Sequence, residues 1–162
     1  MAKFLLAVHV LAAILTVGPV AVAASMFPPL ARRAAAMPGD PAGLGALTAV
    51  HRICRVYALV AVAVPVFGLS TANSMHVLGS AWLISSIVLT VLAAAVLGAL
   101  ILPRQAAALA ALTEHDGSPG ESDPEPVRSA SRRLAMSTGV FNLLWAVVTV
   151  LMIVRPGSTT GA

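Results

Sequence analysis

Near its start the chain carries an apolar run long enough to cross a lipid bilayer. Residues 4–25 read FLLAVHVLAAILTVGPVAVAAS and hold no formal charge when His9 is neutral. A helix of about 20 apolar residues spans the roughly 30 Å hydrocarbon core of a membrane. The run therefore predicts a membrane-spanning helix.

Three further runs of the same kind follow, at about residues 55–72, 77–102 and 134–154. Hydrophobic residues make up 59% of the 162-residue chain and charged residues only 10%. A soluble domain is about half apolar and a quarter charged, so lipid must be the main solvent of this chain. These observations predict an all-α fold, a four-helix transmembrane bundle that forms a single membrane domain over residues 1–162.

The first run could also be read as a secretory signal peptide. Lys3 would supply the basic start, and Ala21-Val22-Ala23 before Ala24 fits a small-residue cleavage site. The run is longer than the apolar part of most signal peptides, and the basic pair Arg32-Arg33 follows it. An uncleaved membrane helix is therefore the favoured interpretation.

Proline and glycine mark the expected breaks between spans. Pro28-Pro29 is expected to end the first helix, and the Pro38–Pro41 segment is a turn signal before a short interfacial helix at about residues 42–50. Pro65 should kink the second span. Residues 113–127 hold five of the six carboxylates and predict a disordered acidic cytoplasmic linker.

The cations predict the orientation of the chain. Eight of the ten Lys and Arg residues flank the first and third connections, and only Lys3 and Arg155 lie at the other end. Under the positive-inside rule those two connections face the cytoplasm and both termini lie outside. Together with a composition rich in Ala, Val and Arg, this suggests the inner membrane of a bacterium.

Each span has a stripe of small or weakly polar residues, which favours close helix packing in lipid. Helical spacing places these stripes inward. The first stripe comprises His9, Ala13, Thr16, Val20 and Ala23, and the fourth comprises Ala135, Thr138, Asn142, Ala146 and Thr149.

His9 is the only ionisable residue well inside a span, and such residues are costly and often functional. One interpretation is a neutral histidine that hydrogen-bonds Thr149 or a backbone carbonyl. Alternatives are a ligand of copper or haem, and a proton-linked role. Met75, His76 and Met152 fall near the same outer end, so with His9 they form a conceivable nitrogen and thioether set for copper.

The motif Val8–Ala13 with Val17-Gly18 resembles the first helix of a bacterial family of predicted four-helix integral membrane proteins of unknown function. That family is distantly similar to the membrane domain of copper-resistance protein D. Pro65 with Gly68-Leu69, Ala81-Trp82-Leu83 and Leu102–Gln105 are similar too. The resemblance implies a four-helix membrane protein in which His9 is the position for a copper or haem role, and it supplies no activity.

The sequence leaves two function classes open. One is small-ligand or metal handling, with copper or haem, through His9. The other is a structural or partner-binding membrane protein without a cofactor, as a homo-oligomer or with another membrane protein. No nucleophile–base pair, carboxylate dyad or phosphate loop is present, and no basic stripe for nucleic acid, so neither an enzyme nor a nucleic-acid-binding protein is expected.

Overall fold

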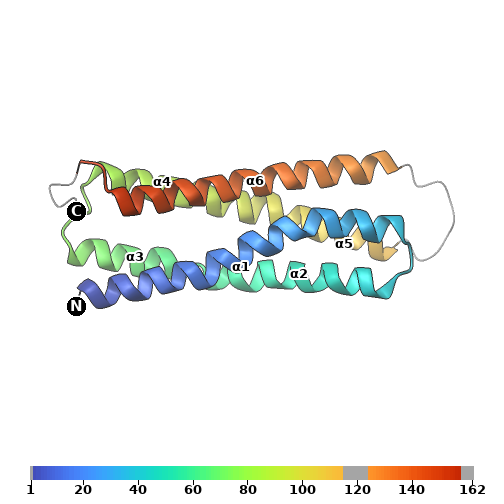
Figure 1. The fold of residues 1–162 in the computed structure, drawn as a ribbon, viewed down its shortest axis with the longest axis horizontal. Helices are drawn as coiled ribbons and strands as arrows, with labels where there is room; N and C mark the ends of the chain where they lie inside the picture. The colour runs from blue at the N-terminus through green and yellow to red at the C-terminus, as the bar shows by residue number, and fades with distance from the viewer. Residues whose placement is uncertain (1, 115–123, 158–162) are drawn as a thin grey trace.

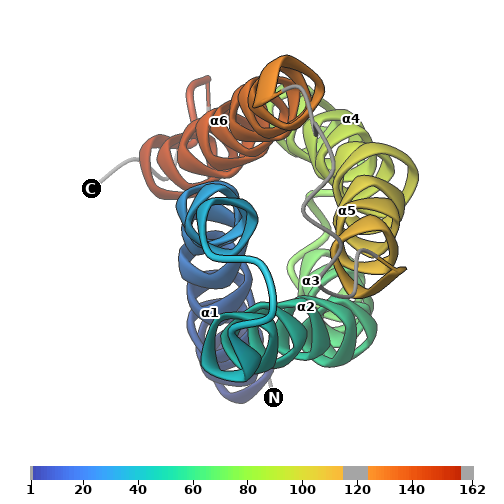
Figure 2. The ribbon, with the colours of Figure 1, turned by 90° about the vertical axis from the view of Figure 1, so that its right-hand side faces the viewer.

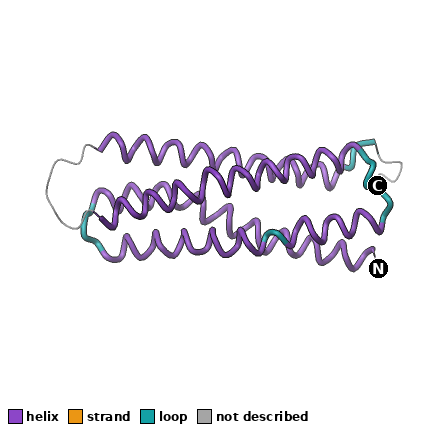
Figure 3. The backbone as a smooth tube through the Cα atoms, turned by 180° about the vertical axis from the view of Figure 1, so that it is seen from behind, coloured by secondary structure: helices purple, strands orange, loops and turns teal. Residues whose placement is uncertain are grey.

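The structure is a computed structural model that describes residues 2–114 and 124–157. In these ranges the fold is all-α, with four long helical rods side by side (Figures 1 and 3). The elements are α1 (Ala2–Ala36), α2 (Pro41–Val60), α3 (Ala63–Ser74), α4 (Ala81–Ala95), the π-helix η1 (Val96–Ile101), α5 (Leu102–Glu114) and α6 (Pro124–Val154).

Four helices are long and apolar enough to cross a membrane, which confirms the predicted fold class. α2 and α3 form one continuous rod, and α4, η1 and α5 form another. α1 packs against the α2–α3 rod and α6, and the rod that contains α4 and α5 packs against α6 and α2, so the rods form a ring (Figure 2). The protein is therefore a multi-pass membrane protein.

The two ends of the bundle differ. The start of α1 and the end of α6 lie at one end, which we call the terminal end, together with the connection between α3 and α4 (Figure 1). The opposite end, which we call the distal end, holds the turn between α1 and α2. At that turn Asp40 caps α2, and its carboxylate accepts hydrogen bonds from the backbone N–H groups of Ala42 and Gly43.

The rod of α2 and α3 is interrupted at Ala61 and Val62, as the kink predicted at Pro65 requires. Proline has no N–H to donate to the carbonyl four residues before it, which here is Ala61. The Ala61 carbonyl instead accepts the N–H of Val64, at 3.0 Å. This tighter turn bends the rod in its middle.

The other irregular helix is η1, where the N–H of Leu102 bonds the carbonyl of Leu97, five residues earlier. Pro103 follows directly and cannot donate to Ala99, so the helix widens by one residue before it. Isolated π-helical turns are rare and occur frequently at functional sites.

The prediction that Pro28-Pro29 ends the first helix is wrong. α1 continues through both prolines to Ala36, and Figure 1 shows it bent near its middle. Phe27 and Ala31, on either side of the prolines, are buried in the core. Their packing against neighbouring helices outweighs the loss of two backbone hydrogen bonds, so the helix continues past the prolines.

The predicted connections are also shorter than expected. Residues 42–50 are not a separate interfacial helix, because they belong to α2. Of the predicted disordered linker, the first two residues lie in α5 and the last four lie in α6. Its central part, residues 115–123, lies outside the described residues.

The predicted inward stripe is correct for α1 and partly wrong for α6. On α1, Thr16, Val20 and Ala23 are buried. On α6, Thr138 is buried as expected, but Ala135, Ala146 and Thr149 are exposed. The buried face of α6 is turned toward larger side chains, namely Leu134, Phe141 and Val148.

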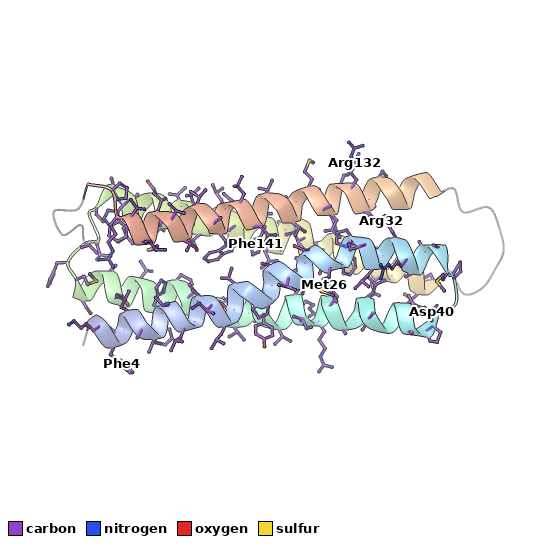
Figure 4. All side chains as sticks on the ribbon, viewed as in Figure 1. Phe4, Met26, Arg32, Asp40, Arg132 and Phe141 are labelled. Atoms are coloured by element: carbon purple, nitrogen blue, oxygen red, sulfur yellow. The ribbon has the colours of Figure 1, made fainter. Side chains whose placement is uncertain are left out.

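Large apolar side chains cover the outside of the bundle only from the terminal end to a common level. The last exposed ones on the four rods are Met26, Ile53, Leu100 and Met136. Beyond that level, among the residues that the structure describes, Met37 is the one large apolar side chain that is exposed. The side chains of most arginines begin close to this level, and Figure 4 shows Arg32 and Arg132 at a similar distance along the bundle.

We call these residues the arginine belt. It consists of Arg32, Arg33, Arg52, Arg55, Arg104, Arg132 and Arg133.

Candidate functional site

A cavity of about 340 Å³ lies between the four rods, and each rod contributes to its wall. The break after α2 supplies Ala61 and Val62, and η1 supplies Leu97 and Gly98. Both irregular turns of the fold therefore face the same space. The volume is at the lower end of the range for small-molecule sites in proteins.

The wall of the cavity is almost entirely apolar. Phe141 and Trp145 from α6 form its aromatic side, with their rings edge to face and centroids 6.4 Å apart. Thr90 also lines the cavity, but its hydroxyl donates to the carbonyl of Ser86 at 2.7 Å. Arg55, from the arginine belt, is the charged residue of the wall.

One hydrogen-bond donor of the wall is unused. The indole Nε1 of Trp145 is buried and has no hydrogen-bond partner among the described residues. A buried indole N–H normally finds a partner, and leaving a polar group unpaired costs about 1–3 kcal/mol. The nitrogen itself is enclosed by protein atoms, so it does not open onto the cavity, although other atoms of Trp145 line the wall.

Two more unpaired atoms lie on the same face of α6, at helical spacing from Trp145. They are the hydroxyl of Thr138 and the Oδ1 of Asn142. The amide nitrogen of Asn142 donates to the hydroxyl of Ser25 on α1 at 3.2 Å, so this face of α6 is turned toward α1. Asn142 therefore forms a hydrogen bond between α6 and α1.

A small apolar cluster packs the helices at the terminal end, and none of its buried members lines the cavity. Ala72, Trp82 and Leu83 are its buried members. α3 and α4 make few contacts with each other, although each packs on another helix. Leu59 and Val62 line the cavity and are also strongly exposed, so its rim faces the bilayer.

His9 lies on α1 at the interface with α3, and its side chain is half-buried. Its Nδ1 is 2.9 Å from the carbonyl oxygen of Val64, and this geometry requires Nδ1–H to be the donor. Of the two partners predicted for a structural histidine, the backbone carbonyl is therefore correct and Thr149 is not. The Thr149 hydroxyl donates instead to the carbonyl of Trp145.

The other residues of the predicted copper set have different surroundings. Met75 follows α3 directly and is half-buried, and His76 is exposed with a positive φ of 54°. Met152 packs against the cluster that contains Trp82. Within residues 2–114 and 124–157, no three His, Cys, Asp or Glu side chains lie together as a metal site. Copper or haem binding through His9, Met75, His76 and Met152 stays a prediction.

A second polar group links α2 to α5, and the sequence alone did not reveal it. Gln105 is fully buried and is held by two side chains of α2. Its Oε1 lies 3.1 Å from Nδ1 of His51, and its Nε2 donates to Sγ of Cys54 at 3.6 Å. His51 and Cys54 are three residues apart and so share a helix face, which is the signal that points to a common partner.

Comparison with protein-family models, with curated proteins and with solved structures found no significant match. No family is therefore assigned to the chain, and the resemblance to the copper-resistance-related family is not supported by these comparisons. The functional argument rests on the cavity and its wall.

Proposed function

We propose that the protein binds a small lipid-soluble molecule in the cavity between its four helices and catalyses no reaction on it. The observation that carries this proposal is a cavity of about 340 Å³ that is lined by residues from all four rods, including residues of both irregular turns.

The wall indicates the chemistry of the ligand. An apolar body would contact Phe141 and the aliphatic side chains, and one acceptor atom would face Arg55, the charged residue of the wall. An aromatic or alicyclic carbonyl compound has both features. Such a molecule dissolves in the bilayer and would enter past Leu59 and Val62.

The proposed position of the membrane follows from the exposed side chains. Large apolar side chains end at the level of Leu100 and Met136, and arginines follow. Trp82 at the terminal end and Arg104 in the belt are separated by about 33 Å at 1.5 Å per residue. This separation matches the roughly 30 Å core of a bilayer. The cavity then lies at membrane depth, and the positive-inside rule places the arginine belt in the cytoplasm and both termini outside.

Benzophenone tests the ligand proposal, because it is apolar, carries one carbonyl acceptor and forms covalent cross-links under near-ultraviolet light. The purified protein in nanodiscs is irradiated with benzophenone, and the labelled residues are mapped by mass spectrometry. We expect labelling at the buried cavity residues Leu97 and Val20 to exceed labelling at the lipid-facing residue Val88.

Two variants make the test specific. Ala94→Phe places a ring in the cavity and should abolish the excess labelling, whereas Ala95→Phe, one residue along the same helix and outside the lining, should leave it unchanged. Labelling that is equal in the two variants would contradict the proposal and favour the partner-binding alternative.

A further inference from the structure

A second, smaller hollow lies on the outside of the bundle, between η1–α5 and α6. It measures about 260 Å³ and is lined by Val96, Leu100 and Arg104 on one side and by Met136, Ser137 and Val140 on the other. On each side the residues follow at three- or four-residue steps, so the hollow is a groove that runs along both helices. It is separate from the central cavity, with which it shares no lining residue.

The groove has an apolar part and a cationic end. Val96, Leu100 and Val140 lie toward the middle of the bundle, and Arg104 lies at the end nearer the arginine belt. Arg133 is one turn from Ser137 on α6, so each wall of the groove ends in an arginine. An acyl chain would fit along the apolar part, with its headgroup at the arginines.

The guanidinium of Arg104 is already oriented for an anion. Its Nη1 donates to the hydroxyl of Ser137 at 2.7 Å, and that hydroxyl donates in turn to the carbonyl of Arg133 at 3.0 Å. Arginine carries five N–H donors, so most of its donors stay available for phosphate oxygens, which it binds in a bidentate manner.

No described carboxylate competes for this site. The acidic side chains that the structure describes are Asp40 and Glu114, and both lie toward the distal end (Figure 4). Glu114 is ten residues beyond Arg104 on the same helix, or about 15 Å. The depth also fits, because Arg104 lies at the level where exposed large apolar side chains end.

We infer that the groove between η1–α5 and α6 binds one acidic phospholipid, with its phosphate on Arg104 and one acyl chain along Leu100 and Val140. The proposal is independent of the ligand in the central cavity. Arg104 in the groove, with Arg133 one turn beyond Ser137, favours an acidic over a zwitterionic headgroup, because both residues are cationic and no described carboxylate lies in the groove.

The test compares phosphatidylglycerol with phosphatidylcholine in their binding to the full chain in detergent, by native mass spectrometry and by the shift in melting temperature. We expect one tightly retained phosphatidylglycerol molecule and no equivalent phosphatidylcholine molecule. Arg104→Gln should raise the dissociation constant for phosphatidylglycerol about tenfold. Arg32→Gln removes the same charge from α1 at a similar level of the bundle and should change it less than twofold.

The apolar part of the groove is tested separately. Val140→Trp fills the groove and should displace the phospholipid, whereas Leu143→Trp, on the exposed surface of the same helix and outside the groove, should not. Circular dichroism checks that all variants remain helical. Equal losses in Arg104→Gln and Arg32→Gln, or retention of phosphatidylglycerol in Val140→Trp, would overturn the proposal, because binding would then be a diffuse effect of the arginine belt.

Discussion

A β-carbon on Gly68 would lie 2.8 Å from Cε1 of His9, closer than side-chain carbons approach in folded proteins. The imidazole ring of α1 therefore occupies the space that a side chain of α3 would fill. The same ring donates to the carbonyl of Val64, one turn before Gly68. A glycine and a histidine together bring these two helices into contact, as small and polar residues do in membranes.

Gly68→Ala should destabilise the protein by about 1–3 kcal/mol, because the added methyl group overpacks the contact with His9. The measurement is the free energy of unfolding in detergent micelles. Gly139→Ala is the matched control, since a β-carbon there meets no atom within 4 Å. The control should be neutral or stabilise α6 slightly, because alanine favours helices over glycine. Equal effects of the two substitutions would mean that the helices separate easily at His9.

Replacement of His9 separates its structural role from a ligand role. His9→Gln should be mild, because an amide N–H can still donate to the Val64 carbonyl, and His9→Leu should cost on the order of 1 kcal/mol. Thermal melting measures both, and metal analysis with an absorption spectrum accompanies them. Bound copper or haem that disappears in both variants while melting is unchanged would establish His9 as a ligand.

Thr138→Val should stabilise the protein. Its hydroxyl is buried, with 3% of the residue exposed, and has no partner among the described residues, so Thr138→Val removes an unpaired polar group at nearly constant shape. We expect a gain of about 1 kcal/mol. Thr71 is similarly buried, but its hydroxyl donates to the Phe67 carbonyl at 2.7 Å, so Thr71→Val should bring no gain. A loss at Thr138 would indicate that a bound water or ligand uses the hydroxyl.

Reporter fusions test the proposed orientation. The start of α1 and the end of α6 lie at one end of the bundle and Gly39 lies at the other (Figure 1). A reporter inserted at Gly39 should be active only in a cytoplasmic form, and one after Gly157 only in an external form, because most arginines lie on the Gly39 side. The reverse pattern would place the arginine belt outside. A mature N-terminus at Ala24 would instead establish cleavage of the first segment.

The sequence was sufficient to predict the class of fold, because apolar runs and charge placement are properties of single helices. It predicted the kink at Pro65 for the same reason, since a missing N–H acts locally. The prediction that Pro28-Pro29 ends the first helix was wrong, because the missing N–H groups of the prolines compete there with the packing of the helix in the core. Phe27 is fully buried, and the contacts that bury it come from helices distant in the sequence.

The candidate site was predicted only in part. His9 was recognised as an inward-facing residue, and its carbonyl partner was one of two options considered. The central cavity was not foreseen, because its wall is made of alanines, valines and leucines that look the same as packing residues. Only their arrangement around Trp145, Ala61 and Gly98 distinguishes them.

Each of three rods is 34 residues long, or about 51 Å, which exceeds the hydrocarbon core of a bilayer by roughly 20 Å. With the belt at the membrane surface, the excess lies in water at the distal end, where Ala34, Leu47 and Val50 are buried. Lipid gives apolar side chains no reason to associate, whereas water does. The hydrophobic effect therefore favours association of the helices mainly at the distal end. Helices that insert separately should associate there first and pack at the terminal end afterwards.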